Sequence, residues 1–214
     1  MANRVSAQEA LNGFKPRAAV AAGEVFDASP ANLNARTHRI TLPSGLKLAL
    51  LPKKSRGETV NVQFNFHFGS EQGLQNERVA GSLAPEMLTL GTKGKTRAQV
   101  QDAFDALKTD WTVSGNPWVA SARLSTKREN LDAALTLLAE VLREPEFPAG
   151  EFEQLVRRQV GCVEAASTEP ASIAEVKLRR AAKPYPVSDV RYTADFAEQV
   201  SALNALSRDA VIAY

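Results

Sequence analysis

The chain has 214 residues, which is enough for one large domain with a buried core or for one domain with an added tail. Its 26 lysines and arginines against 24 aspartates and glutamates leave a net charge of +2, so bulk charge does not recruit nucleic acid or a membrane surface. Hydrophobic residues at 44% and charged residues at 23% exclude a wholly disordered or fibrous chain and predict a folded, water-soluble domain.

Residues 1–35 predict a linker or arm. The segment is rich in alanine, is broken by glycine and proline, and shows no sustained apolar period, with a short helix predicted only over 6–11. Its longest apolar stretch, 18–22, is far shorter than the ~18 residues of a membrane span and weaker than a signal-peptide core. The start of the chain therefore predicts neither a membrane span nor a targeting segment.

Alternation of apolar and polar residues predicts five strands after this segment. Two short runs, 38–42 and 46–50, flank a Pro-Ser-Gly turn signal and predict a hairpin that begins the domain at residue 36. The run 60–68 alternates strictly and predicts a third strand with one apolar and one polar face. Two further strands, 111–113 and 118–124, are predicted around a Gly-Asn-Pro turn.

Helices are predicted between and after these strands. The apolar segment 79–90 predicts a buried helix that contains Pro85, and 96–108 predicts a second helix with Thr96 as its N-cap. The remaining predicted helices are 131–142, 152–163, 170–184 and 195–206.

The order of elements predicts the fold class. Strands, helices, strands and then a run of helices favour an α+β fold, with a mostly antiparallel mixed sheet and helices packed on one face as two layers. Ser207 is predicted to cap one more helix, which has reached only about two turns at Tyr214. Because a natural domain rarely ends so early in a helix, we expect the sequence to be a piece of a longer protein, truncated at the C-terminal end.

The segment Gly94-Lys95-Thr96 resembles the end of a phosphate-binding loop, G-x-x-x-x-G-K-T, whose backbone amides cradle phosphates. The first glycine of that pattern falls on Thr89, and the residues before it predict a helix instead of the required strand. We therefore interpret the segment as a solvated loop between two helices.

Other residues with catalytic chemistry are few. No G-x-S-x-G nucleophile elbow occurs, and the two histidines, His38 and His67, are predicted on strands without catalytic partners. The single cysteine, Cys162, excludes an internal disulfide and a multi-cysteine zinc site, and its place on an apolar helix stripe predicts a buried, inert thiol. One dense basic cluster is predicted at a helix end, where the helix dipole favours positive charge: Lys177, Arg179, Arg180 and Lys183.

Two short motifs carry a resemblance to a known family. Phe68-Gly69-Ser70-Glu71 ends the third predicted strand, and the segment 87–92, Met-Leu-Thr-Leu-Gly-Thr, closes the helix that follows. In this order they resemble the insulinase or pitrilysin-type zinc metallopeptidases, also called inverzincins. Active domains of that family show a strand ending in Gly-Ser, a helix with H-x-x-E-H, a Met-Leu-x-x-Gly-Thr tail and a second helix. The resemblance covers about 36–214.

The zinc motif itself is degenerate in this sequence. In the family, two imidazoles one helical turn apart hold Zn²⁺, and the glutamate between them deprotonates the bound water. Here the first histidine falls on Ser82, the glutamate on Pro85 and the second histidine on Glu86. The third ligand, a later glutamate, falls in the window 161–163, with Glu164 just outside it. We therefore predict no catalytic residue and no metal ligand at these degenerate positions.

The resemblance implies an architecture for the parent protein. Family members consist of two halves, each with two related α+β domains, which close like a clamshell around a peptide, and typically only the first domain keeps the zinc motif. By this resemblance, 36–214 is an inactive peptidase-like domain that opens the second half, and 1–35 tethers the halves. Its partners would be the catalytic half, which holds the zinc, and a peptide or protein substrate, with no nucleic acid.

Two alternatives remain open from the sequence. The first is an enzyme with an atypical metal site, in which Glu86 and Glu164, together with His67, bind a harder cation such as Mn²⁺ or Mg²⁺ through oxygens. The second is a stand-alone inactive subunit that serves a separate active partner. A Glu86→Ala variant separates the first alternative from an inactive domain that forms part of the wall of the peptide-binding chamber. Only the metal site predicts that the variant loses metal binding and activity.

Overall fold

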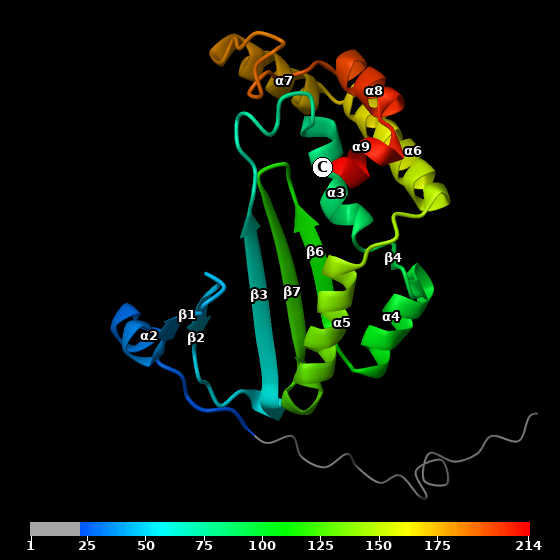
Figure 1. Ribbon diagram of the computed structural model, residues 1–214. Coiled ribbons are helices and arrows are strands. Elements are labelled where there is room, and N and C mark those ends of the chain that lie inside the picture. The colour runs from blue at the N-terminus through cyan, green and yellow to red at the C-terminus, as the bar shows by residue number, and fades with distance from the viewer. Residues whose placement is uncertain (1–21) are drawn as a thin grey trace, which may run out of the picture. The chain divides into compact units, whose positions relative to one another are not determined.

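The computed structural model describes residues 22–214, and the chain divides into two compact units, one up to Thr59 and one from Val60 onward (Figure 1). The helix predicted over 6–11 lies outside the described residues. Within 22–214, no helix combines the length and the apolar character needed to cross a bilayer. The tethering role of 1–35 and the domain boundary that follows it stay predictions.

Among the described residues of the first unit, a helix lies in the segment predicted as a linker. Helix α2 (Pro30–Arg36) starts after Ser29, whose side chain accepts a hydrogen bond from the backbone N–H of Asn32. Proline suits the first helical position because its missing N–H has no partner there in any helix. The sequence interpretation missed α2 because seven residues are too few to show an apolar period, although the Ser-Pro start was a usable signal.

The predicted hairpin is confirmed in the first unit. Strands β1 (His38–Thr41) and β2 (Lys47–Leu50) pair antiparallel, and a short 3₁₀ turn, η1 (Arg56–Glu58), follows them. The connecting turn closes with a hydrogen bond of 2.8 Å from the Leu42 N–H to the Leu46 carbonyl. Gly45 in this turn has φ +84°, a left-handed conformation that glycine adopts without strain.

The second unit is built on a three-stranded sheet with the order β3-β7-β6. The strands are β3 (Thr59–His67), β6 (Asp110–Gly115) and β7 (Val119–Lys127), and β6 pairs antiparallel with β7. The Phe68 N–H donates to the Trp118 carbonyl at 3.2 Å, which joins the end of β3 to the start of β7, so these strands also run antiparallel. The three strands predicted here are therefore confirmed.

Two helices cover one face of this sheet (Figure 1). Helix α4 (Arg97–Ala106) begins at Thr96, which forms the predicted N-cap and a capping box with Gln99. Helix α5 (Leu131–Arg143) follows β7 through a 3₁₀ turn, η2 (Arg128–Asn130). The buried side chains between these helices and the sheet form what we call the sheet-side core: Val100, Phe104, Ala122, Leu124, Ala134, Leu137, Leu138 and Val141.

A second core is formed mainly by helices. Helices α3 (Arg78–Met87), α6 (Ala149–Ala166), α8 (Phe196–Ala205) and α9 (Arg208–Ala213) contribute to it, and α7 (Pro170–Ala182) buries no residue. We call this cluster the helical core: Ala80, Leu83, Met87, Leu90, Phe152, Leu155, Leu203 and Val211. The short strands β4 (Gly91–Thr92) and β5 (Lys95–Thr96) pair after α3. The α+β class, antiparallel pairing and helical coverage predicted from the sequence are confirmed.

Candidate functional site

Helix α3 carries the three positions onto which the sequence resemblance maps the zinc motif. Ser82 is exposed, and its Oγ donates a hydrogen bond of 2.7 Å to the backbone carbonyl of Val79. Pro85 is buried. Glu86 forms an ion pair with Arg158, which projects from α6. The one carboxylate at these positions is therefore engaged by a cation of the same protein.

The side chains at these positions do not fit a zinc ion. A hydroxyl bonded to a carbonyl, a proline ring and an ion-paired carboxylate supply no imidazole and no base for a bound water. Glu164 on α6 and His67 on β3 are both exposed. Across the part of the chain that the structure describes, no three His, Cys, Asp or Glu side chains lie close enough to share an ion. The structure thus does not assemble the alternative site from Glu86, Glu164 and His67.

Ser82 lines a groove of about 750 Å³ that is bordered by α3, α6, α7 and α8, all within the second unit. This volume falls in the range of ~300–1,000 Å³ typical of ligand sites. Apolar side chains contribute to its wall: Val79, Leu83, Val163, Val176, Phe196 and Leu203. We call it the α3–α7 groove. A second hollow, of about 520 Å³, is bordered by the degenerate motif residue Pro85 together with Phe68 and Tyr214.

Three arginines and a single carboxylate border the α3–α7 groove. Arg191 makes a two-pronged contact with Asp189, with its Nε and Nη2 donating at 2.8 and 2.7 Å. These hydrogen bonds from the Arg191 side chain lower the pKa of Asp189 to about 2. Arg179 pairs with Glu175, one helical turn earlier on α7. Arg78, at the start of α3, instead donates from Nη1 to the backbone carbonyl of Tyr192 at 2.6 Å.

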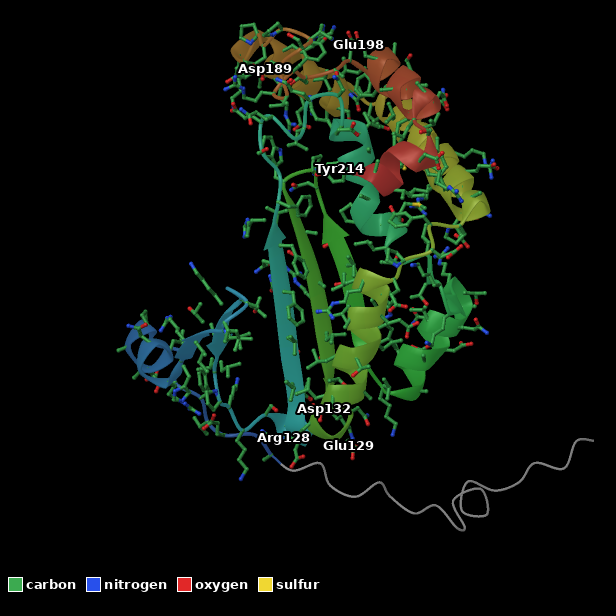
Figure 2. All side chains as sticks on the ribbon, in the orientation of Figure 1. Arg128, Glu129, Asp132, Asp189, Glu198 and Tyr214 are labelled. Carbon is green, nitrogen blue, oxygen red and sulfur yellow. The ribbon has the colours of Figure 1, made fainter. Side chains whose placement is uncertain are left out.

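A hydrogen-bond network holds the segment that Arg78 contacts. The Tyr192 hydroxyl donates to Glu198 at 2.8 Å and accepts from Arg180 at 3.1 Å. The bond to Glu198 is the main reason why the pKa of Tyr192 is raised. Arg180 also pairs with Asp195, which forms the N-terminal capping box of α8 with Glu198. Figure 2 shows Asp189 and Glu198 at the same end of the second unit.

Tyr214 fills a space that the sequence interpretation did not identify. Its hydroxyl donates to the Pro117 carbonyl at 2.7 Å, and its ring packs edge-on against Phe68 with centroids 6.0 Å apart. A Cβ atom at Gly81 of α3 would lie 2.6 Å from Cζ of this ring, so only glycine leaves room for it. Burial raises the pKa of Tyr214. The usable sequence signal was a glycine in the middle of a buried helix.

The remaining candidates from the sequence have structural partners. Lys95 of the Gly-Lys-Thr segment pairs with Glu140 at 2.7 Å. Glu140 also accepts a hydrogen bond from buried Thr92. The pKa of Glu140 is lowered chiefly by the contact with Lys95 and further by the bond from Thr92. In the basic cluster, Arg179 and Arg180 are engaged in ion pairs with acidic residues of α7 and α8.

Cys162 is exposed, so the prediction of a buried thiol is wrong. The reason is that α6 buries residues only in its first half, Phe152 and Leu155, while its second half borders the groove. His67 on β3 and His38 on β1 are both exposed.

Comparisons with known proteins were made on sequence and on structure. No protein-family profile matches the chain, and no curated protein matches its sequence. Among solved structures, the chain is similar to a peptidase M16 inactive domain from Pseudomonas fluorescens, with a TM-score of 0.68 and 19% identity over 83% of this chain and 42% of that one. It is also similar to the periplasmic protease PqqL from Escherichia coli, with a TM-score of 0.67 and 9% identity over 93% and 21%.

A third similar structure is a mutant of the ferredoxin protease FusC in complex with Arabidopsis ferredoxin, with a TM-score of 0.64 and 11% identity over 93% of this chain and 21% of that one. At these identities the likeness shows the fold, and the chain has an M16-like fold. It spans about two-fifths of the first of these structures and about one-fifth of the other two.

Proposed function

We propose that this chain is a non-catalytic domain of a larger zinc peptidase of the insulinase or pitrilysin type. In this proposal it forms part of the wall of a clamshell chamber that holds a peptide, and the catalytic zinc lies in another domain. The observation that carries the proposal is helix α3, which keeps its packing face while Ser82, Pro85 and ion-paired Glu86 occupy the motif positions.

The structural neighbours support this proposal. One is described as an inactive domain of an M16 peptidase, and others are proteases whose chains are about five times as long as the matched part. The FusC structure contains a protein bound to that protease. A domain that shares their fold and lacks zinc ligands serves best as a binding surface beside a catalytic domain.

Two features of the second unit suit an extended peptide. Strands β3 and β6 are the edges of the three-stranded sheet, and an edge strand presents backbone N–H and C=O groups with which a peptide can pair. The α3–α7 groove offers a concave wall with apolar and polar side chains together. Both hold a polypeptide without any contribution from a metal.

Metal content and cleavage test the proposal directly. When the chain is purified without a metal-binding tag, elemental mass spectrometry should find no stoichiometric zinc. It should also leave a quenched fluorescent peptide uncut. Zinc near one equivalent per chain, or cleavage that a chelator abolishes, would contradict the proposal.

The Glu86→Ala variant tests the alternative of an oxygen-ligand metal site. The Glu86–Arg158 pair is partly exposed, with 41% of the Glu86 side chain accessible, so its loss should cost only about 0–1 kcal/mol of unfolding free energy. The matched control is Glu153→Ala, which removes an exposed carboxylate that pairs with Arg157 on α6. Calorimetric titration with Mn²⁺ should give the same result for both variants and the parent chain. A Mn²⁺ signal lost only in Glu86→Ala would support the metal site instead.

A further inference from the structure

We propose that the α3–α7 groove binds an acidic side chain of an extended polypeptide, and that Arg78 is the residue that receives the carboxylate. The inference rests on the proposed function, because it assigns a chemical preference to the peptide that the domain is proposed to hold. It is carried by the distribution of charge along the groove.

Arg78 is the arginine of the groove that makes no direct ion pair within the described residues, although its charge also helps to lower the pKa of Asp189. Its guanidinium donates to the Tyr192 carbonyl, a neutral acceptor, and forms no ion pair with a carboxylate among residues 22–214. A guanidinium carries five N–H donors in a planar fork that matches a carboxylate. One of these donors is used, so the others remain for a ligand.

The other two arginines of the groove already have carboxylate partners. Arg191 is held by both oxygens of Asp189, and Arg179 is paired with Glu175. Their guanidinium groups are therefore occupied by direct carboxylate contacts, while Arg78 acts on Asp189 only at longer range and keeps donors free for a ligand. An anionic group that enters the groove consequently gains most from the end of the groove at the start of α3.

The position of Arg78 is set before a ligand arrives. Its hydrogen bond of 2.6 Å to the Tyr192 carbonyl fixes the guanidinium, and the Tyr192 side chain is itself fixed by Glu198 and Arg180. A side chain that is ordered in advance loses less conformational entropy when it binds, which favours affinity. Apolar residues such as Val79, Leu83 and Phe196 line the same groove. The occupant that fits both features is a polypeptide segment in which an acidic residue stands next to a bulky apolar one.

The experiment uses the full chain and two labelled, unstructured peptides of equal length. One contains Leu-Glu pairs, and the other contains Leu-Gln pairs of nearly the same shape and no charge. Fluorescence anisotropy at low salt should give an affinity about three- to tenfold higher for the Leu-Glu peptide, as one partly exposed charge-assisted contact provides. The preference should shrink as salt rises from ~50 mM toward ~500 mM, because ions screen an accessible pair.

Two variants that each remove one arginine charge test where the preference for the Leu-Glu peptide arises. Arg78→Gln should bring the two affinities within about twofold of each other. Arg128→Gln removes an exposed arginine at the opposite end of the second unit (Figure 2) and should keep the preference of the parent chain. Ser82→Trp places a large ring in the groove and should weaken both peptides together. Circular dichroism spectra that match the parent chain establish that each variant is folded.

The outcomes separate this inference from the proposed function. If both peptides bind equally to the parent chain, the acidic preference fails, and if Arg78→Gln keeps the preference, the assignment to Arg78 fails. In both cases the chain still binds peptides, so the proposed peptide-holding role stands. If neither peptide binds at all, the proposed peptide-holding role fails and this inference fails with it. A preference that Arg78→Gln removes and Arg128→Gln keeps, together with weaker binding of both peptides to Ser82→Trp, supports the inference.

Discussion

The sheet-side core and the α3–α7 groove show two different outcomes of helix packing in the same unit. In the core, α4 and α5 press apolar stripes onto the sheet, and Phe104 is fully buried with its ring stacked on Trp111 at 4.5 Å. Along the groove, α7 buries no residue, and polar or charged side chains stand beside the apolar ones. The first region stabilises the fold and the second leaves an accessible surface.

Helix α3 contributes both to a buried core and to the wall of the groove. One side contributes Ala80, Leu83 and Met87 to the helical core, and the motif positions Ser82 and Glu86 lie outside that core. On this helix, the side chains that pack in the helical core are therefore different from those at motif positions 82 and 86, while the third motif position, Pro85, is buried. The fold of this helix therefore does not depend on the chemistry of the side chains at positions 82 and 86.

The largest expected effect is in the sheet-side core. Phe104→Ala should lower the unfolding free energy by about 3–5 kcal/mol, because the lost ring leaves a cavity that its neighbours fill only in part. Ser82→Ala, in the groove, should change it by less than about 0.5 kcal/mol, since the side chain is exposed and bonds only its own helix. Urea unfolding followed by circular dichroism compares the two. Similar losses for both variants would contradict the distinction between core and groove.

A smaller change in unfolding free energy is expected at Gly81, and its sign depends on whether Tyr214 is present. Gly81→Ala should destabilise the chain by about 1 kcal/mol, because overpacking against the Tyr214 ring costs about 1–3 kcal/mol and exceeds the gain in helix propensity. In a Tyr214→Ala background the clash is absent, and the same substitution should stabilise by about 0.5–1 kcal/mol. A double-mutant cycle by thermal and urea unfolding measures the coupling. Additive effects would show that Tyr214 does not occupy this space.

The smallest effect concerns the charges at the rim of the groove. The pKa of Asp189 is lowered from 3.8 to about 2 by Arg191, so the pair contributes stability above about pH 4 and loses it as pH falls toward 2. Arg191→Gln should return the pKa toward 3.8, which NMR titration of the carboxyl carbon detects. The control Arg128→Gln should leave this titration unchanged. An Asp189 pKa near 3.8 in the parent chain would rule out the paired geometry.

The local patterns of the sequence were sufficient for most secondary structure. Alternation over 60–68 marked β3, and Thr96 and Ser207 marked helix starts that the structure confirms with side-chain caps. Two sequence predictions were wrong, for different reasons. Helix α2 was too short to show a period, and Cys162 is exposed although its neighbours Val160 and Val163 pack partly against the helical core. A pattern describes a face of a helix, but burial depends on whether another element covers that face.

By itself, the sequence determined the α+β class, the order of the elements and the absence of imidazole at the motif positions, because these depend on residue type and near-neighbour spacing. Tertiary structure alone decided that Glu86 meets Arg158, that Tyr214 lies over Gly81 and that Arg78 bonds the Tyr192 carbonyl beside a groove. These contacts join residues far apart in the chain, such as Arg78 and Tyr192, which are 114 positions apart. Their partners are chosen by how the helices pack, which no local pattern encodes.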